Sequence, residues 1–126
     1  MERRYDLTGN KRAVGAYYED RAAEYLESLN WQILERNFCT KAGEIDIIAR
    51  DGDCIVFVEV KYRAGERFGT PFEAVDPRKQ RKISRTALMY FNRRGYPQDT
   101  AGRFDVIGIS ADGKIYHIQN AFEFCG

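Results

Sequence analysis

The segment GEIDIIARDGDCIVFVEVKYR, residues 43–63, constrains the fold of this chain more than any other stretch. Two runs rich in Ile, Val and Phe flank the sequence RDGD, and an Asp-Gly pair between apolar runs is a strong signal for a β-hairpin. We therefore expect strands near residues 44–50 and 54–63. The second run is apolar on both faces, which is typical of a strand inside a sheet rather than at a solvated surface.

The remaining elements follow from periodicity and from helix-end signals. Apolar residues at helical spacing predict a helix over about residues 10–29, and WQILERNF predicts a strand over 31–38. Asp76 followed by Pro77 predicts the start of a second helix, which should run to about Arg94 before Gly95 ends it. A last pair of strands is expected at 103–109 and 114–118. This order of helix, three strands, helix and two strands predicts a central sheet with helices on its faces.

Composition limits the class of protein. At 126 residues, with 44% hydrophobic and 31% charged residues, the chain is expected to form a single globular domain over residues 1–126. It has no apolar run long enough to span a membrane and no apolar core near its start, so we expect a cytoplasmic protein without a membrane partner. Three widely spaced cysteines and one histidine, His117, argue against a disulfide framework, a zinc ribbon and Ser-His-Asp chemistry.

Positive charge is concentrated in one part of the chain. Ten basic and three acidic residues lie between Lys61 and Arg94, a net charge of +7 in a chain whose total is +1. Such a concentration is expected either for a polyanion partner or for a solvated helix face. The candidate nucleic-acid contacts are Arg63, Arg78, Lys79, Arg81, Lys82 and Arg85.

The charged residues of the hairpin form a candidate site. A turn centred on Asp51-Gly52 pairs position 46 with 57, whereas a four-residue loop pairs 46 with 59. Both registers place Asp46, Glu59 and Lys61 on the same face, because side chains alternate along a strand. Two carboxylates about 5 Å apart repel by roughly 3 kcal/mol at an effective dielectric near 20, so a cation is required nearby.

Two cations could meet that requirement: Lys61, or a hard metal ion such as Mg²⁺ or Mn²⁺, which all-oxygen sites favour. The structural alternative is an ordinary salt bridge on a solvated sheet face.

Each predicted helix adds one polar residue to its apolar side. Glu19 lies close to the apolar stripe of the first helix, unlike Asp20, so it is either a core anomaly or a third carboxylate for the same site. Gln80 aligns with Ile83 on the inward side of the second helix. Its side chain is expected either to join the site or simply to cap or hydrogen-bond a neighbouring strand.

These residues together resemble a known group of proteins. Glu19, Asp46, Glu59-Val60-Lys61 and Gln80, in this order of elements, resemble the PD-(D/E)XK nuclease superfamily. The segments GAYYEDRAAEYL, RNFCTKAGEIDIIARDG, VFVEVKYR, DPRKQRKI and RFDVI are similar to the YraN-like family of small bacterial proteins, which is similar to archaeal Holliday-junction resolvases. The resemblance covers nearly the whole chain. One departure is Ile45, which stands where the superfamily signature has proline.

The resemblance implies a fold and roles for the residues. The fold would be a restriction-endonuclease-like α/β/α sandwich with a mixed central sheet. Asp46, Glu59 and Glu19 would hold Mg²⁺ or Mn²⁺ with the Val60 carbonyl, Lys61 would be the catalytic lysine, and Gln80 would lie near the site. Glu44 and Asp105 match family motifs without an assigned role, and pairing of Asp105 with Arg103 is an equal expectation.

The function implied is metal-dependent hydrolysis of phosphodiester bonds, in DNA rather than RNA, with branched or damaged DNA as candidate substrates. The alternatives are a non-catalytic nucleic-acid-binding module of recombination or repair and an ordinary structural or interaction domain. A homodimer is compatible with paired cuts.

Overall fold

The computed structural model describes residues 11–63 and 75–125, and it contains the predicted elements in the predicted order. These elements are α1 (Lys11–Ser28), β1 (Gln32–Cys39), β2 (Glu44–Asp51), β3 (Cys54–Arg63), α2 (Pro77–Arg94), β4 (Ala101–Ser110) and β5 (Ile115–Phe122). Neither described helix is long and apolar enough to cross a membrane.

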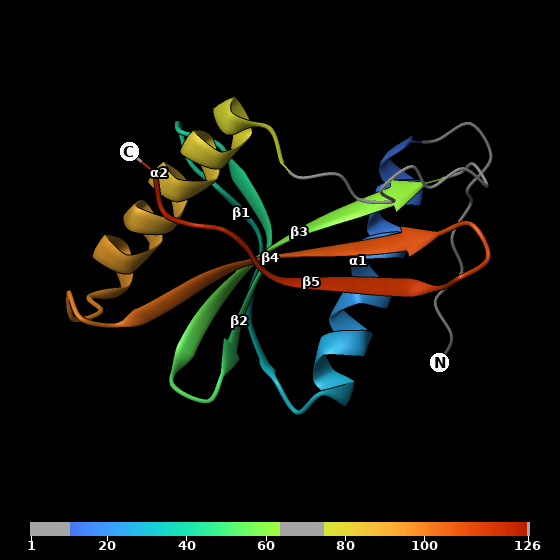
Figure 1. Ribbon diagram of the computed structural model, residues 1–126, viewed down its shortest axis with the longest axis horizontal. Helices are drawn as coiled ribbons and strands as arrows, with labels where there is room; N and C mark the ends of the chain where they lie inside the picture. Colours follow the sequence, from blue (N-terminus) through green and yellow to red (C-terminus); the bar gives the residue numbers. More distant parts are fainter. Residues whose placement is uncertain (1–10, 64–74, 126) are drawn as a thin grey trace.

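The five strands form one mixed sheet in the order β1-β2-β3-β4-β5. Neighbouring strands are antiparallel except for β3 and β4, which are parallel. Parallel neighbours need a crossover connection, and α2 lies within it, between β3 and β4 in the chain. Figure 1 shows the strands fanned out in a strongly twisted sheet, with α2 and α1 well apart. The predicted α/β fold class with a mixed central sheet is confirmed.

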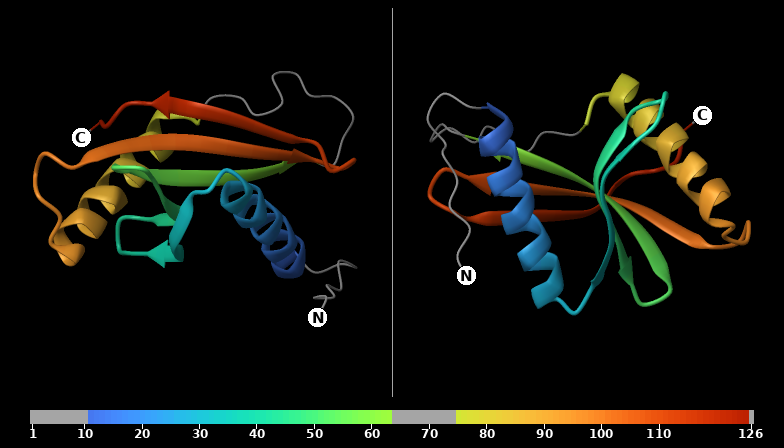
Figure 2. Two further views of the ribbon diagram at one scale, coloured as in Figure 1. Left: turned by 90° about the horizontal axis from the view of Figure 1, so that it is seen from below. Right: turned by 180° about the vertical axis from the view of Figure 1, so that it is seen from behind.

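The two helices cover opposite faces of the sheet. Ile55 and Phe57 of β3 belong to the core beneath α2, whereas Val56 and Val58 belong to the core beneath α1. Because side chains alternate along a strand, these two sets point to opposite faces. Viewed from behind, in the right panel of Figure 2, α1 lies in front of β3, β4 and β5. The central strand β3 is therefore buried on both faces, as its continuous apolar run predicted.

The hairpin has the register that was expected for a four-residue loop, but its turn has only two residues, Gly52 and Asp53. Asp51 pairs with Cys54 across a two-residue turn, and Ile47 pairs with Val58. Gly52 in this turn has φ 59°, a left-handed conformation in which glycine is favoured. The register therefore places positions 46 and 59, rather than 46 and 57, opposite each other.

The ends of α2 match their sequence signals. The Asp76 side chain accepts a hydrogen bond from the Lys79 backbone N–H, 3.0 Å away, and Pro77 is the first helical residue. Gly95 ends the helix with φ 68°, and its N–H donates to the carbonyls of Asn92 and Phe91. These caps set where α2 begins and ends, and thus which of its residues face the sheet.

Candidate functional site

Asp46, near the start of β2, and Glu59, in the middle of β3, lie close to each other. The Ile47–Val58 pair is the last step of this ladder, and the next positions along the two strands are Asp46 and Glu59. The Val60 backbone N–H donates to Asp46 Oδ2 at 2.8 Å, which ties the Asp46 carboxyl to β3. Both acids line an open pocket of about 270 Å³ between the sheet and α2. The structure thus brings together the two carboxylates that the strand pattern placed on one face.

The pair resists carrying two negative charges. Burial, and after it the neighbouring Glu59 carboxylate, raise the pKa of Asp46 from 3.8 to about 8, against the opposing effect of the Val60 N–H. Glu19 and Glu44 add smaller contributions in the same upward direction. At neutral pH Asp46 therefore holds a proton unless a cation takes its place. Such a site favours a bound cation.

Lys79 of α2 is a cation in direct contact with Glu59. Its Nζ lies 2.9 Å from Glu59 Oε1, and it also lines the pocket. Burial opposes the charge of Lys79, but the hydrogen bond and charge of Glu59 outweigh it and raise the pKa of the lysine. Sequence reasoning placed Lys79 among the nucleic-acid contacts and did not foresee this ion pair. Lys61 lies half-buried on β3, two residues after Glu59, as the strand pattern requires.

Glu19 lies on α1, close to the pair but with partners of its own. Its Oε1 is 4.0 Å from Arg36 Nη2. Burial raises the pKa of Glu19, Arg36 and Asn37 act in the opposite direction, and Glu44 and Glu59 make small upward contributions. Over residues 11–63 and 75–125, no group of three or more His, Cys, Asp or Glu side chains is arranged to hold a metal ion. Glu19 as a third ligand therefore stays a prediction.

Asp20 is more buried than its position on the helix predicted. Its helical position placed it on the polar side of α1, yet its side chain is only 14% exposed and forms an ion pair with Arg36 at 2.6 Å. Helical periodicity could not foresee this, because β1 supplies the arginine that covers Asp20.

The α2 residues predicted for the site and for nucleic-acid contacts differ in their surroundings: Gln80 has a partner within the protein, whereas the basic residues are exposed. Gln80 Nε2 donates to the Val75 carbonyl at 2.7 Å, so its side chain caps the segment that leads into α2 and does not bond a neighbouring strand there. Five predicted contacts are exposed on α2, namely Arg78, Lys79, Arg81, Lys82 and Arg85. The side chain of Arg63 lies outside the described residues.

The donor atoms of this pocket fit a hard divalent cation. Two carboxylates on adjacent strands, one of them with a pKa raised to about 8, provide oxygen ligands and a need for positive charge. Mg²⁺ commonly binds through one or two carboxylates and completes its shell with water and substrate oxygens. A backbone carbonyl such as that of Val60 is the same class of donor. The residues present therefore suit Mg²⁺ or Mn²⁺ chemically.

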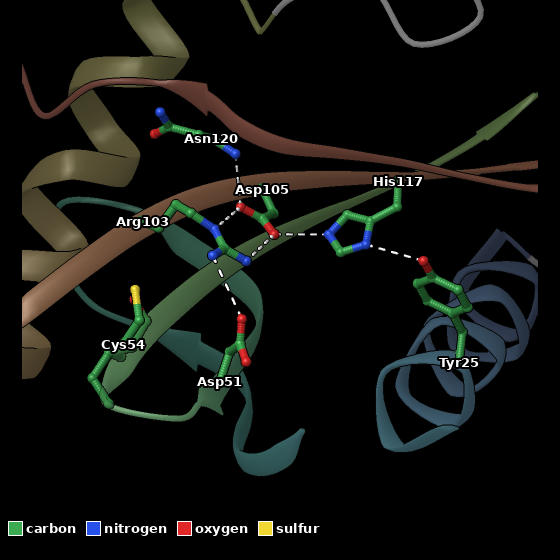
Figure 3. Close-up of polar contacts among 8 residues, drawn as sticks. Tyr25, Asp51, Cys54, Arg103, Asp105, His117 and Asn120 are labelled. Atoms are coloured by element: carbon green, nitrogen blue, oxygen red, sulfur yellow. Dashed lines mark hydrogen bonds and ion pairs between the residues drawn. The ribbon is translucent and has the colours of Figure 1, made fainter. Parts of the chain in front are cut away.

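A second polar cluster centres on Asp105 of β4 (Figure 3). Asp105 is buried and accepts hydrogen bonds from Arg103 Nε at 2.8 Å and from the Asn120 backbone N–H at 3.0 Å. His117 Nε2 lies 2.7 Å from Asp105 Oδ2, and His117 Nδ1 lies 3.1 Å from the Tyr25 hydroxyl. The expected pairing of Asp105 with Arg103 is confirmed; the links to His117 and Tyr25 were missed.

The Asp105 cluster has a structural character. Burial by itself opposes the charge of Asp105, but hydrogen bonds from His117, Arg103 and Asn120 lower its pKa below the ordinary value. The carboxylate is thus fully satisfied, and the cluster joins β4, β5 and α1. A satisfied buried network of this kind holds elements in one arrangement.

Comparison with known proteins agrees with the sequence motifs. Residues 18–109 match the family described as Uncharacterised protein family UPF0102. The chain belongs to this family. It is the YraN-like family that the motifs resemble, so that prediction is confirmed.

Relatives in the family span almost the same length. A UPF0102 protein of Geobacter sulfurreducens is 49% identical over 118 residues, which cover 90% of this chain and 91% of that protein. A UPF0102 protein of Aliivibrio salmonicida is 48% identical over 114 residues, which cover 89% of this chain and 93% of that protein. Among solved structures, the crystal structure of SSO0001 matches with a TM-score of 0.44 and 16% identity, over 91% of this chain and 55% of that one.

Proposed function

We propose that this UPF0102 protein is a metal-dependent nuclease that hydrolyses DNA phosphodiester bonds. The observation that carries the proposal is the pair of Asp46 and Glu59 in one pocket, with the pKa of Asp46 raised to about 8, beside a basic helix. Perturbed carboxyl groups that converge in a pocket are typical of functional sites, because a sheet gains no stability from them. The family resemblance, which implies the same residues, supports the same reaction.

Each residue then has a role. Asp46 and Glu59 hold Mg²⁺ or Mn²⁺, with the Val60 carbonyl and Glu19 as the further ligands that the resemblance implies. When bound, the ion stabilises negative charge on the phosphate and lowers the pKa of water. Lys61 lies two residues beyond Glu59 on the same strand face, where its ammonium group orients the attacking water. Gln80 supports the start of α2 through its hydrogen bond to Val75.

Lys79 links the carboxylates to the substrate. Its ammonium group has three N–H donors, and the contact with Glu59 Oε1 uses one of them. The others are available for a phosphate oxygen that enters the pocket. Beyond the pocket, Arg78, Arg81, Lys82 and Arg85 contact the phosphate backbone, together with Arg63. Such contacts position nucleic acid without reading its sequence.

A second candidate is a non-catalytic nucleic-acid-binding module in recombination or repair. The ion pair between Lys79 and Glu59 favours it, because this contact already neutralises one of the two carboxylates. In this alternative the basic helix binds nucleic acid and the acidic pair serves only to place α2.

Metal and DNA titrations separate the candidates. Mn²⁺ is titrated calorimetrically into the wild type, into Asp46→Asn and into Asp53→Asn, a control that removes the same charge from an exposed position in the hairpin turn. Cleavage of linear, flapped and four-way DNA and of matching RNA is then measured. Mn²⁺ binding and cleavage should be lost in Asp46→Asn and kept in Asp53→Asn.

Absence of metal binding and of cleavage on every substrate would rule out the nuclease. Salt-dependent DNA binding that survives Asp46→Asn without any cleavage by the wild type would establish the accessory module. Sedimentation of the complex with four-way DNA tests the proposed homodimer, because two subunits per junction are expected for paired cuts.

A further inference from the structure

An aromatic groove lies on the flank of α2 away from Lys79. It has a volume of about 560 Å³, within the range of about 300–1,000 Å³ usual for small-ligand sites. The C-terminal half of α2, the loop after it, the start of β4 and the C-terminal segment form its walls. The side chains that define its chemistry are Leu88, Phe91, Asn92, Tyr96, Gln98 and Phe124.

Packing beneath the groove holds its rings in place. Phe91 meets Phe57 edge-on at 5.3 Å between ring centroids and Tyr96 at 5.6 Å. Phe124 packs on Phe104 at 4.5 Å. A Cβ atom at Gly102 would come within 3.1 Å of Phe91 and 3.4 Å of Phe124, so the glycine lets both rings close over β4. The aromatic surface is therefore preorganised.

Part of this apolar surface is exposed. The exposed fraction is 50% for Leu88 and 41% for Phe124. Asn92 and Gln98 add amide donors and acceptors at the rim. A surface that combines fixed rings with amide groups suits a flat heteroaromatic ligand, which stacks on the rings and forms hydrogen bonds along its edge.

The charge beside the groove points to the chemical class of that ligand. Helix α2 carries seven basic residues and no acidic one over Pro77–Arg94. Arg81, Arg85, Leu88 and Asn92 follow one another at spacings of four, three and four residues, so they form one stripe along the helix. The two arginines are exposed and lead directly to the two groove residues. The stripe thus runs from cationic to apolar surface, matching the phosphate and base of a nucleotide.

We propose that this groove binds an unpaired nucleotide of a nucleic-acid strand, with its base against Phe91, Tyr96 and Phe124 and its phosphates along Arg81 and Arg85. Base stacking on aromatic side chains beside a basic surface is how single strands are held without sequence preference. The inference takes its substrate class, DNA, from the proposed function. It narrows that substrate to DNA that carries an unpaired segment. Leu88 lies nine residues beyond Lys79, about 14 Å along the helix axis and on the opposite side of α2, so a strand that contacts both sites has to pass around the helix.

Binding without cleavage tests the groove by itself. The probes are a blunt duplex and the same duplex with a single-stranded tail that carries 2-aminopurine, both used in EDTA. The wild type should bind the tailed duplex at least about fivefold more tightly than the blunt one, and the 2-aminopurine emission should fall on stacking. Phe124→Ala and the more exposed Leu88→Ala should each remove most of this preference. Leu29→Ala, which truncates a side chain 39% exposed at the end of α1, is the matched control and should keep it.

Three outcomes overturn the inference: equal affinity of the wild type for both duplexes, unchanged 2-aminopurine emission, or groove variants that behave as Leu29→Ala does. Circular dichroism checks that each variant is folded, and Leu88→Ala, at a surface position, keeps the test decisive if Phe124→Ala unfolds. The groove and the nuclease are separable. Tail-dependent binding without any Mn²⁺-dependent cleavage would refute the proposed nuclease activity and support nucleotide binding in the groove. Cleavage without a preference for the tailed duplex would support the nuclease activity and refute the binding in the groove.

Discussion

The substitution Asp46→Asn should change how the stability of the protein depends on pH. In the folded protein the pKa of Asp46 is raised from 3.8 to about 8, chiefly by burial and then by Glu59. A carboxyl whose pKa rises on folding binds more protons in the folded state than in the unfolded state between these two values. The free energy of unfolding should therefore fall as the pH rises from about 4 to about 8. Asparagine has no proton to lose and keeps an acceptor for the Val60 N–H.

The magnitude follows from the pKa change. Each tenfold change in proton affinity corresponds to about 1.4 kcal/mol, so full ionisation of Asp46 costs up to about 6 kcal/mol. Because the carboxyl lines an open pocket, solvent screens part of this cost, and we expect about half, roughly 3 kcal/mol. More than half of this loss occurs below pH 5, so the stability of the wild type relative to Asp46→Asn should fall by about 1 kcal/mol between pH 5 and pH 8.

Urea unfolding of the metal-free proteins at pH 5, 6, 7 and 8 measures this difference directly. Asp53→Asn, at an exposed turn position, should show no such trend. Mn²⁺ at 100 times its dissociation constant should stabilise the wild type at pH 8 by about 2.7 kcal/mol and leave Asp46→Asn unchanged. A difference between wild type and Asp46→Asn that stays flat with pH, or that favours the wild type more at pH 8 than at pH 5, would refute the reasoning.

Three further predictions concern single side chains. Lys79→Gln should lower the free energy of unfolding by about 1 kcal/mol relative to Arg78→Gln, because Glu59 loses its ion-pair partner. Saturating Mn²⁺ should remove this difference in stability between the two variants. Equal urea midpoints of the two variants without metal would contradict the prediction. Lys61→Met should slow DNA cleavage at least about 100-fold with Mn²⁺ affinity kept, and a parallel loss of affinity would show a ligand-holding role instead. Asp105→Asn should cost about 3 kcal/mol at pH 7, because Arg103 and His117 lose a buried anion. The difference in the free energy of unfolding between the wild type and Asp105→Asn should narrow below about pH 3.8, as the wild-type carboxyl gains its proton. Acid-unfolding curves of the two proteins can check this.

Sequence reasoning did well where the signals are local. The Asp-Gly turn, the caps Asp76 and Gly95, and the alternation along β3 each depend on neighbouring residues, so the pattern predicted the structure closely. The same-face argument for Asp46 and Glu59 held because it did not depend on the register. Choosing the register required the turn geometry, which put Asp51 opposite Cys54.

Contacts between distant segments could not be read from these patterns. The ion pair of Lys79 with Glu59 joins residues 20 positions apart on opposite sides of the segment between β3 and α2. The hydrogen bond of His117 to Tyr25 joins residues 92 positions apart. Alternation along KIYHIQ predicted the strand that carries His117 but said nothing about which helix would meet it. Asp20 shows the same limit, since its burial depends on Arg36 from another element.

The sequence by itself determined the elements, their order, the family and the common face of Asp46 and Glu59, because helix caps, turns and strand alternation act within a few residues. Only the tertiary structure decided that Lys79 reaches Glu59 and that Asp105 meets His117. It also decided that Phe91 and Phe124 close over Gly102. The physical reason is that these contacts depend on the twist of the sheet and on how α2 crosses from β3 to β4, which many residues set together.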